Sequence, residues 1–172
     1  HTLRRNESLR ELQFPYEYRT GQKELAVSVY RALARRRNLF IQAPTGIGKT
    51  PSVVYPPLKS MGNGTGEKLF YLTAKTITRS GAENCFALLR ERVMLFTTVT
   101  VTAKEKLCPM EKTECNPDAC PGAKGHFDRV NDAVFDIIHE QHGITREVIL
   151  EYADRYQVCP FEFCLDISSW AD

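Results

Sequence analysis

A short apolar run that leads straight into a glycine-rich turn constrains the fold of this chain more than any other feature. Residues 38–42 are mostly apolar and are typical of a buried parallel strand. The turn that follows reads Ala43-Pro44-Thr45-Gly46-Ile47-Gly48-Lys49-Thr50. It fits the phosphate-binding P-loop pattern, except that Ala43 stands in place of the first glycine. A chance glycine-rich turn is the alternative, but the strand before it and the helix after it favour the P-loop.

The P-loop pattern predicts a role for each of its residues. Gly46 and Gly48 let the backbone wrap a phosphate so that successive N–H groups point inward. The N-terminus of the following helix adds partial positive charge. Lys49 is expected to reach the β- and γ-phosphates of ATP, and the Thr50 hydroxyl to ligate Mg²⁺. Residues 43–50 are therefore predicted to bind the nucleotide, with Lys49 and Thr50 as the catalytic pair.

Strand-like and helix-like segments alternate through the first two thirds of the chain. Apolar residues recur at helical spacing in residues 21–36 and 76–92, whereas residues 68–73 and 93–101 have the short, β-branched or apolar character of strands. This alternation predicts an α/β fold with a P-loop, RecA-like parallel sheet flanked by helices. Pro56-Pro57 should kink or end the helix that follows the P-loop.

The chain changes character after Cys108, where the alternation gives way to a loop rich in Cys, Pro and Asp. Two helical stretches follow, at about 127–140 and 145–156. Charge divides in the same way. Residues 1–106 hold 18 Lys/Arg and 8 Asp/Glu, whereas residues 107–172 hold 5 and 13. Two regions of opposite charge predict two functional units, and the basic one suits either a polyanion such as DNA or RNA or simply a solvated surface.

Five of the six cysteines also lie in the second region. Clustered cysteines in a protein without signs of secretion more often bind a metal than form disulfides. The spacing of Cys108, Cys115, Cys120 and Cys159 matches neither the tight pairs of zinc fingers nor the compact runs of ferredoxins, so spacing alone does not identify the metal. Cys164 and Cys85 are expected to be packing residues. His126, His139 and His142 are expected at the surface.

The segment ahead of the first strand adds a second nucleotide signal. Tyr16-Glu17-Tyr18-Arg19-Thr20-Gly21-Gln22 resembles the Q-type motif of superfamily 2 helicases, in which a glutamine amide pairs with the adenine edge. The carboxamide of Gln22 offers a donor and an acceptor side by side, as such pairing requires. The alternative for Gln22 is an exposed residue at the start of a helix.

The cysteine segments extend this resemblance to a family. Residues 102–108, 115–121 and 158–163 resemble the segments that carry the cluster cysteines of XPD/DinG-type DNA helicases, in which an iron–sulfur domain interrupts the first RecA-like motor domain. The resemblance covers nearly everything from residue 14 to 172. It implies that Cys108, Cys115, Cys120 and Cys159 ligate one [4Fe–4S] cluster. It also implies ATP and Mg²⁺ as cofactors, and single-stranded DNA and DNA junctions as partners.

The resemblance also predicts the organisation of the chain. Residues 1–13 are interpreted as a linker or helix, 14–106 as the first part of motor domain 1, 107–165 as the mainly helical iron–sulfur insertion, and 166–172 as the return to the motor domain. The chain begins at His1 and shows no Asp-Glu-x-His box, so it is interpreted as a piece of a longer helicase that would be nearly inactive alone. The rest of the helicase core is expected on the parent chain.

The expected activity is 5′→3′ unwinding of DNA in repair or recombination, in a bacterial cytoplasm and associated with the nucleoid. No membrane partner is expected, because no apolar run approaches the length of a membrane span. Cations at or near the strand ends, Lys75, Arg79, Lys104 and Lys106, are interpreted as a phosphate track, beside which the acidic insert would act as a rigid wedge. The alternatives are an RNA-directed superfamily 2 ATPase with a structural zinc insert, and a non-catalytic nucleotide-binding module.

Overall fold

The computed structural model describes residues 2–44, 46–74, 76–92 and 95–172. It divides the chain into two compact units, unit 1 (His1–Phe96) and unit 2 (Thr97–Asp172). The division after Phe96 falls ahead of the boundary predicted at 106/107, and the predicted domain limits stay a prediction. Thr45 and Lys75, which the sequence singles out for nucleotide and DNA contacts, lie outside the described residues.

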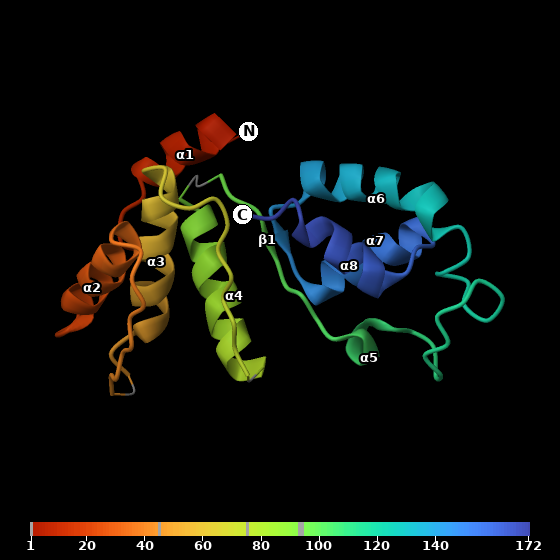
Figure 1. Ribbon diagram of the computed structural model, residues 1–172, viewed down its shortest axis with the longest axis horizontal. Helices are drawn as coiled ribbons and strands as arrows, with labels where there is room; N and C mark the ends of the chain where they lie inside the picture. The colour runs from red at the N-terminus through yellow and green to blue at the C-terminus, as the bar shows by residue number, and fades with distance from the viewer. Residues whose placement is uncertain (1, 45, 75, 93–94) are drawn as a thin grey trace. The chain divides into compact units, whose positions relative to one another are not determined.

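The described part of unit 1 is built from four helices: α1 (Thr2–Arg10), α2 (Gln22–Ala34), α3 (Lys49–Gly62) and α4 (Thr76–Arg90). Helix α3 packs against the other three and lies between α2 and α4 in Figure 1. The core of unit 1 gathers apolar side chains from α1, α3, α4 and the segments that follow α1 and α4: Leu9, Leu12, Val54, Leu58, Met61, Cys85, Leu89 and Phe96. The helices predicted over 21–36 and 76–92 are confirmed.

Helix α3 does not end at Pro56-Pro57, so of the predicted kink or end of the helix, the end is wrong. The helix continues to Gly62 with both prolines inside it. Each proline removes one backbone hydrogen bond. Continuing the helix, however, buries Leu58 and Met61 to 2% and 3% exposure. Burial of two large apolar side chains contributes roughly 3–6 kcal/mol, which offsets the lost hydrogen bonds.

The two apolar runs of unit 1, residues 38–42 and 68–73, have no strand structure among the residues that the structure describes. Phe40 is 95% exposed and Leu72 is 88% exposed. A strand in a parallel sheet is held by hydrogen bonds to its neighbours, and neither run is paired with one. The RecA-like sheet expected from residues 38–42 and 68–73 therefore stays a prediction.

Unit 2 contains a small parallel sheet and four helices in order along the chain. The elements are β1 (Thr98–Val99), α5 (Lys104–Leu107), α6 (His126–Glu140), β2 (Gly143–Ile144), α7 (Arg146–Tyr156) and α8 (Pro160–Ser168). Thr98 pairs with Gly143, and Val99 pairs with Ile144. The helices predicted at 127–140 and 145–156 are confirmed as α6 and α7. Of the strand predicted at 93–101, only β1 is formed, and residues 93–94 lie outside the described part.

The core of unit 2 lies among α6, α7 and α8, with one residue from α5 and one from β2. Its buried members are Leu107, Val130, Ala133, Ile137, Ile144, Ile149, Tyr152, Ala153, Val158, Phe163, Cys164 and Ile167. Asp172 is hydrogen-bonded to Thr97, the first residue of unit 2. Its carboxylate accepts a hydrogen bond from Thr97 N at 2.8 Å. Asp172 N donates in turn to Thr97 O at 2.9 Å. No helix in the described part of the chain is both long and apolar enough to cross a membrane.

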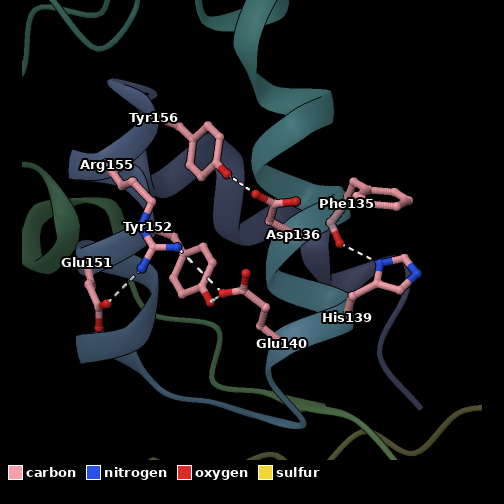
Figure 2. Close-up of polar contacts among 8 residues, drawn as sticks. All are labelled: Phe135, Asp136, His139, Glu140, Glu151, Tyr152, Arg155 and Tyr156. Atoms are coloured by element: carbon pink, nitrogen blue, oxygen red, sulfur yellow. Dashed lines mark hydrogen bonds and ion pairs between the residues drawn. The ribbon is translucent and has the colours of Figure 1, made fainter.

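A polar seam joins α6 to α7 (Figure 2). The Tyr152 hydroxyl donates to the Glu140 carboxylate, and the Tyr156 hydroxyl donates to that of Asp136. Arg155 lies over the Tyr152 ring, 4.4 Å from its centroid, and pairs with Glu140 at 3.5 Å. The hydrogen bond to Asp136 is the main cause that raises the pKa of Tyr156, and burial is the main cause for Tyr152. The seam fixes the two helices that border the cysteine loop.

Candidate functional sites

The turn that matches the P-loop pattern, residues 43–50, is called the P-loop below and leads into the N-terminus of α3. Gly46 and Gly48 have left-handed backbone angles, with φ of 85° and 79°, and Gly48 caps the helix. Lys49 and Thr50 occupy the first turn of α3. The first-turn N–H groups of a helix have no partner within the helix and attract anions. Positive φ at both glycines and a helix N-terminus directly after them are compatible with phosphate binding, which stays a prediction for residues 43–50.

The Lys49 side chain is folded back over its own loop. Its Nζ donates to Ala43 O at 3.1 Å and to Pro44 O at 2.8 Å. Both contacts are exposed to solvent, so they hold the ammonium only weakly. Lys49 can exchange these carbonyl partners for phosphate oxygens without breaking any buried contact.

Gln22 connects the Q-type segment to the P-loop. It is the first residue of α2 and is only 2% exposed. Its Nε2 donates to Gly48 O at 3.1 Å, and its Oε1 accepts from Arg19 N at 2.9 Å. Arg19 reaches the loop as well, because its guanidinium donates to Gly46 O at 2.9 Å. The alternative of an exposed Gln22 is wrong: the residue does begin a helix, but the loop covers it.

Both atoms of the Gln22 carboxamide are therefore engaged by protein backbone. The amide keeps a second N–H and its oxygen a second lone pair, but the side chain is only 2% exposed, so adenine recognition requires the covering loop to move. The structure brings Gln22 and residues 46–50 together, as expected of one nucleotide site. Of the predicted nucleotide contacts, Ala43 and Pro44 supply carbonyls to Lys49, and Ile47 lies between the two glycines, half-buried.

The second site is a cavity of about 470 Å³ in unit 2. The four cysteines proposed as cluster ligands all line it: Cys108, Cys115, Cys120 and Cys159. Cys108 follows the last residue of α5, and Cys159 caps the N-terminus of α8. Residues that are far apart in the sequence thus share one cavity. Among the residues that the structure describes, however, no three His, Cys, Asp or Glu side chains are gathered closely enough to hold a metal ion.

A tight turn presents Cys120 to this cavity. The side-chain carbonyl of Asn116 accepts hydrogen bonds from Asp118 N at 3.0 Å and Ala119 N at 2.8 Å. Asn116 O accepts from Cys120 N at 2.9 Å. Asparagine at the start of a turn supplies this pattern, and Pro117 fixes the backbone beside it. The loop between Cys115 and Cys120 is therefore ordered by its own sequence.

Lys104 places a positive charge at the cavity. Its Nζ lies 3.6 Å from Cys115 Sγ, 3.8 Å from Glu162 Oε1 and 4.8 Å from the centroid of the Phe161 ring. The negative charge available on Cys115 is the main cause that raises the Lys104 pKa, with smaller contributions from Glu162 and Cys159. The sequence interpretation placed Lys104 on a phosphate track. The structure directs its ammonium toward Cys115, and the predicted phosphate contact stays a prediction.

The remaining cysteines and the histidines differ in how deeply they are buried. Cys85 and Cys164 are buried in the two cores, at 7% and 0% exposure, which confirms them as packing residues. His139 and His142 are exposed, as predicted. His126 is only 3% exposed, so its predicted surface position is wrong. It lines the cysteine cavity, and its Nδ1 accepts a hydrogen bond from Cys159 N at 3.2 Å. Sequence spacing gives no sign of this contact, because its two residues come from different elements.

Comparisons with known proteins give one similarity and two negative results. Over 47 residues, 27% of this chain, the sequence is 40% identical to a probable ATP-dependent helicase of Methanocaldococcus jannaschii. The matched stretch is only 7% of that protein, so the chain spans a small part of the relative. No family model matches the chain. No solved structure matches it.

Proposed function

We propose that the chain is the nucleotide- and metal-binding part of an ATP-dependent DNA helicase of the XPD/DinG type. The observation that supports the proposal is the contact of Gln22 with Gly48, because it joins the glutamine of the Q-type sequence to a turn whose glycines and helix N-terminus suit a phosphate. The short similarity to a probable ATP-dependent helicase supports an ATP-dependent helicase activity in coarse terms. The DNA substrate and the 5′→3′ direction rest on the family resemblance.

The residues of unit 1 have distinct roles in this proposal. The N–H groups of the P-loop and of the first turn of α3 bind the ATP phosphates. Lys49 leaves the Ala43 and Pro44 carbonyls and meets the β- and γ-phosphates, and Thr50 ligates Mg²⁺. Gln22 exchanges the Gly48 carbonyl for the adenine edge. The exposed apolar runs at 38–42 and 68–73 enter a RecA-like parallel sheet completed by the rest of the helicase core.

Unit 2 holds a [4Fe–4S] cluster in this proposal. The donor set fits the group, because the four cysteines that line the cavity are the ligand number and type that such a cluster requires. Lys104 offsets part of the negative charge of four thiolates from beside Cys115. Loading requires the four sulfurs to move closer together than the metal-free arrangement holds them. When bound, the cluster supplies a rigid cross-link between α5, the cysteine loop and α8.

DNA contacts are assigned to the basic residues 1–106 rather than to the acidic residues 107–172. Three of the five cations in residues 107–172 are held by unit 2 itself. Arg129 donates to Tyr156 O at 2.9 Å, Arg146 donates to Lys106 O at 2.7 Å, and Arg155 pairs with Glu140 at 3.5 Å. Few cations are left for phosphates, which supports a wedge beside the DNA track rather than a clamp on it.

Two measurements test the proposal. The first is Mg²⁺-dependent binding of ATP to the chain and to Lys49→Ala, which should bind far more weakly while remaining folded. The second is a metal analysis after anaerobic reconstitution, in which iron and labile sulfide at four each per chain are expected. Zinc without sulfide would instead favour the RNA-directed ATPase with a structural zinc insert. Folded protein without any ATP binding would contradict the helicase proposal.

A further inference from the structure

His126 is the one histidine of the described cavity lining, and it is buried there. It is the first residue of α6, directly after Gly125, whose φ of 68° turns the chain into the helix. A turn connects Cys120 to the start of this helix. In this turn Cys120 O accepts hydrogen bonds from Ala123 N and Lys124 N, both at 3.1 Å. The imidazole therefore belongs to the segment that follows Cys120 in the chain.

The imidazole contacts the segment that leads into α8. Its Nδ1 accepts the backbone N–H of Cys159 at 3.2 Å. Cys159 precedes α8, where its own carbonyl accepts the first helical hydrogen bond from Phe163 N at 3.0 Å. The Cys159 N–H lies before that helix, so no bond within α8 can satisfy it. His126 thus supplies the acceptor that fixes the backbone of a cysteine at the cavity wall.

The hydrogen bond also fixes the tautomer of the ring. A nitrogen that accepts a backbone N–H carries no proton, so the proton of the neutral ring is on Nε2. Nε2 lies 3.7 Å from Asp166 Oδ2 on α8, beyond hydrogen-bond distance. It has no hydrogen-bond partner among the described residues. The Phe127 ring packs edge-on against the imidazole, with centroids 5.3 Å apart. The ring is held between α6 and α8 by these contacts.

We propose that His126 is a positioning residue for the metal site: through Nδ1 it holds the backbone of Cys159 so that Sγ of this ligand faces the cavity before and after a cluster is loaded. The inference rests on the cluster of the proposed function but concerns a residue outside the ligand set. It assigns no metal bond to His126, because Nδ1 is already engaged and Nε2 is directed toward Asp166. Losing the contact frees the Cys159 end of the site and lets the bound cluster dissociate faster.

Three substitutions separate this role from packing and from ligation. His126→Asn places an amide oxygen close to the position of Nδ1 but leaves a smaller side chain. His126→Phe keeps the ring volume and the contact with Phe127 but has no acceptor. His126→Gln places its amide nearer the position of Nε2. If His126 acts through its hydrogen bond, the Asn variant should retain the cluster longer than the Phe variant. If it acts by packing, the Phe variant should retain the cluster longer than the Asn variant. If it acts as a ligand through Nε2, the Gln variant should retain the cluster longest of the three.

The experiment uses the full 172-residue chain, reconstituted with iron and sulfide. The half-time of bleaching in the presence of an iron chelator is measured for each variant without oxygen. Backbone hydrogen exchange of a peptide containing Cys159 is measured in the same proteins without metal. We expect His126→Phe to bleach roughly tenfold faster and to lose protection at Cys159, since an orphaned buried N–H carries a cost of that size. His126→Asn should bleach within about twofold of the wild type.

The outcomes distinguish the two levels of the proposal. A wild-type chain that takes up zinc and no labile sulfide contradicts the cluster itself. A wild-type chain that holds the cluster, with His126→Phe bleaching at the same rate, contradicts the role of His126 alone. Faster bleaching of Asn than of Phe assigns the residue to packing and also overturns the inference. Thermal unfolding of each metal-free variant shows that the compared proteins are folded.

Discussion

The Gln22 carboxamide donates a hydrogen bond to the carbonyl of Gly48 across 3.1 Å, and so joins the start of α2 to the turn that begins α3. A Cβ atom built on Gly48 would lie 2.3 Å from Gln22 Nε2. Gly48 therefore has two reasons to be glycine: a φ of 79° and the close approach of this amide. A displacement of the Gln22 side chain would therefore remove a contact that Gly48 makes at the start of α3.

Gly48→Ala should destabilise unit 1 more than Gly46→Ala does. Both glycines have positive φ, but no described residue beyond the chain neighbours of Gly46 comes within 4 Å of a Cβ built there. Gly46→Ala should therefore lower the free energy of unfolding by about 1 kcal/mol, through backbone strain alone. Gly48→Ala should lose about 2 kcal/mol, because Gln22 must also be displaced. Urea unfolding gives both values. In the Gln22→Ala background the excess loss at Gly48 should disappear, and an excess that persists would contradict the contact.

Lys49→Ala and Lys59→Ala should have opposite effects. The contacts of Lys49 are with exposed carbonyls, so its removal should leave the free energy of unfolding within about 0.5 kcal/mol and make ATP binding far weaker. Lys59 Nζ donates to Arg10 O and, at 3.1 Å, to Leu12 O, which ties α3 to the end of α1. Lys59→Ala should cost about 1 kcal/mol and leave ATP affinity unchanged. Calorimetric titration and urea unfolding of the same samples measure both quantities.

Lys104 and Lys106 should separate metal retention from DNA binding. Lys104 faces Cys115, Glu162 and the Phe161 ring, whereas the Lys106 side chain is exposed. Lys104→Met should lower the iron retained per chain and change single-strand affinity little. Lys106→Met should do the reverse and reduce the slope of log affinity against log salt by about 1. If Lys104→Met lowers DNA affinity and Lys106→Met does not, Lys104 contacts the DNA phosphates and this prediction is contradicted.

Local sequence patterns predicted the helices of this chain well. Helices α2, α4, α6 and α7 lie where apolar side chains recur every three or four residues. Helix α8 was missed, although Pro160 at its start and the apolar Phe163 and Ile167 were usable signals. The strand predictions depended on partners elsewhere in the sequence. Local pattern contains no information about which strand pairs with which.

In the candidate sites too, features that are contiguous in sequence were predictable and contacts between distant residues were not. Residues 43–50 were identifiable because a P-loop is contiguous in sequence. The four cysteines were named by resemblance, and the structure brings them to one cavity without placing them at metal-binding distance. The contacts of Gln22 with Gly48 and of His126 with Cys159 join residues that are far apart in the chain. Only the folded arrangement reveals such contacts.

Alkaline pH should destabilise unit 1 through Cys85. Burial raises the pKa of its thiol from 9.0 to about 11. The folded state thus holds the proton more tightly than the unfolded state does. The resulting stabilisation is complete below pH 9 and is lost as the pH rises toward 11. By pH 10 the loss should be about 1 kcal/mol. Cys85→Ala should lower stability at pH 7 but remove this part of the decline, and parallel pH curves for the two proteins would contradict the assignment.

Cys120→Ser and Cys164→Ala should have different consequences although both remove a thiol from unit 2. Cys120 lines the cavity on the turn ordered by Asn116, so its loss should bleach the reconstituted protein. Cys164 lies in the core at 0% exposure, with Sγ 3.8 Å from Thr100 O. Its truncation should leave the colour intact and lower the free energy of unfolding by roughly 1 kcal/mol. Iron and sulfide analysis with urea unfolding measures both effects. Bleaching by Cys164→Ala in a folded protein, with Cys120→Ser still coloured, would show that the cluster is bound by a different set of cysteines.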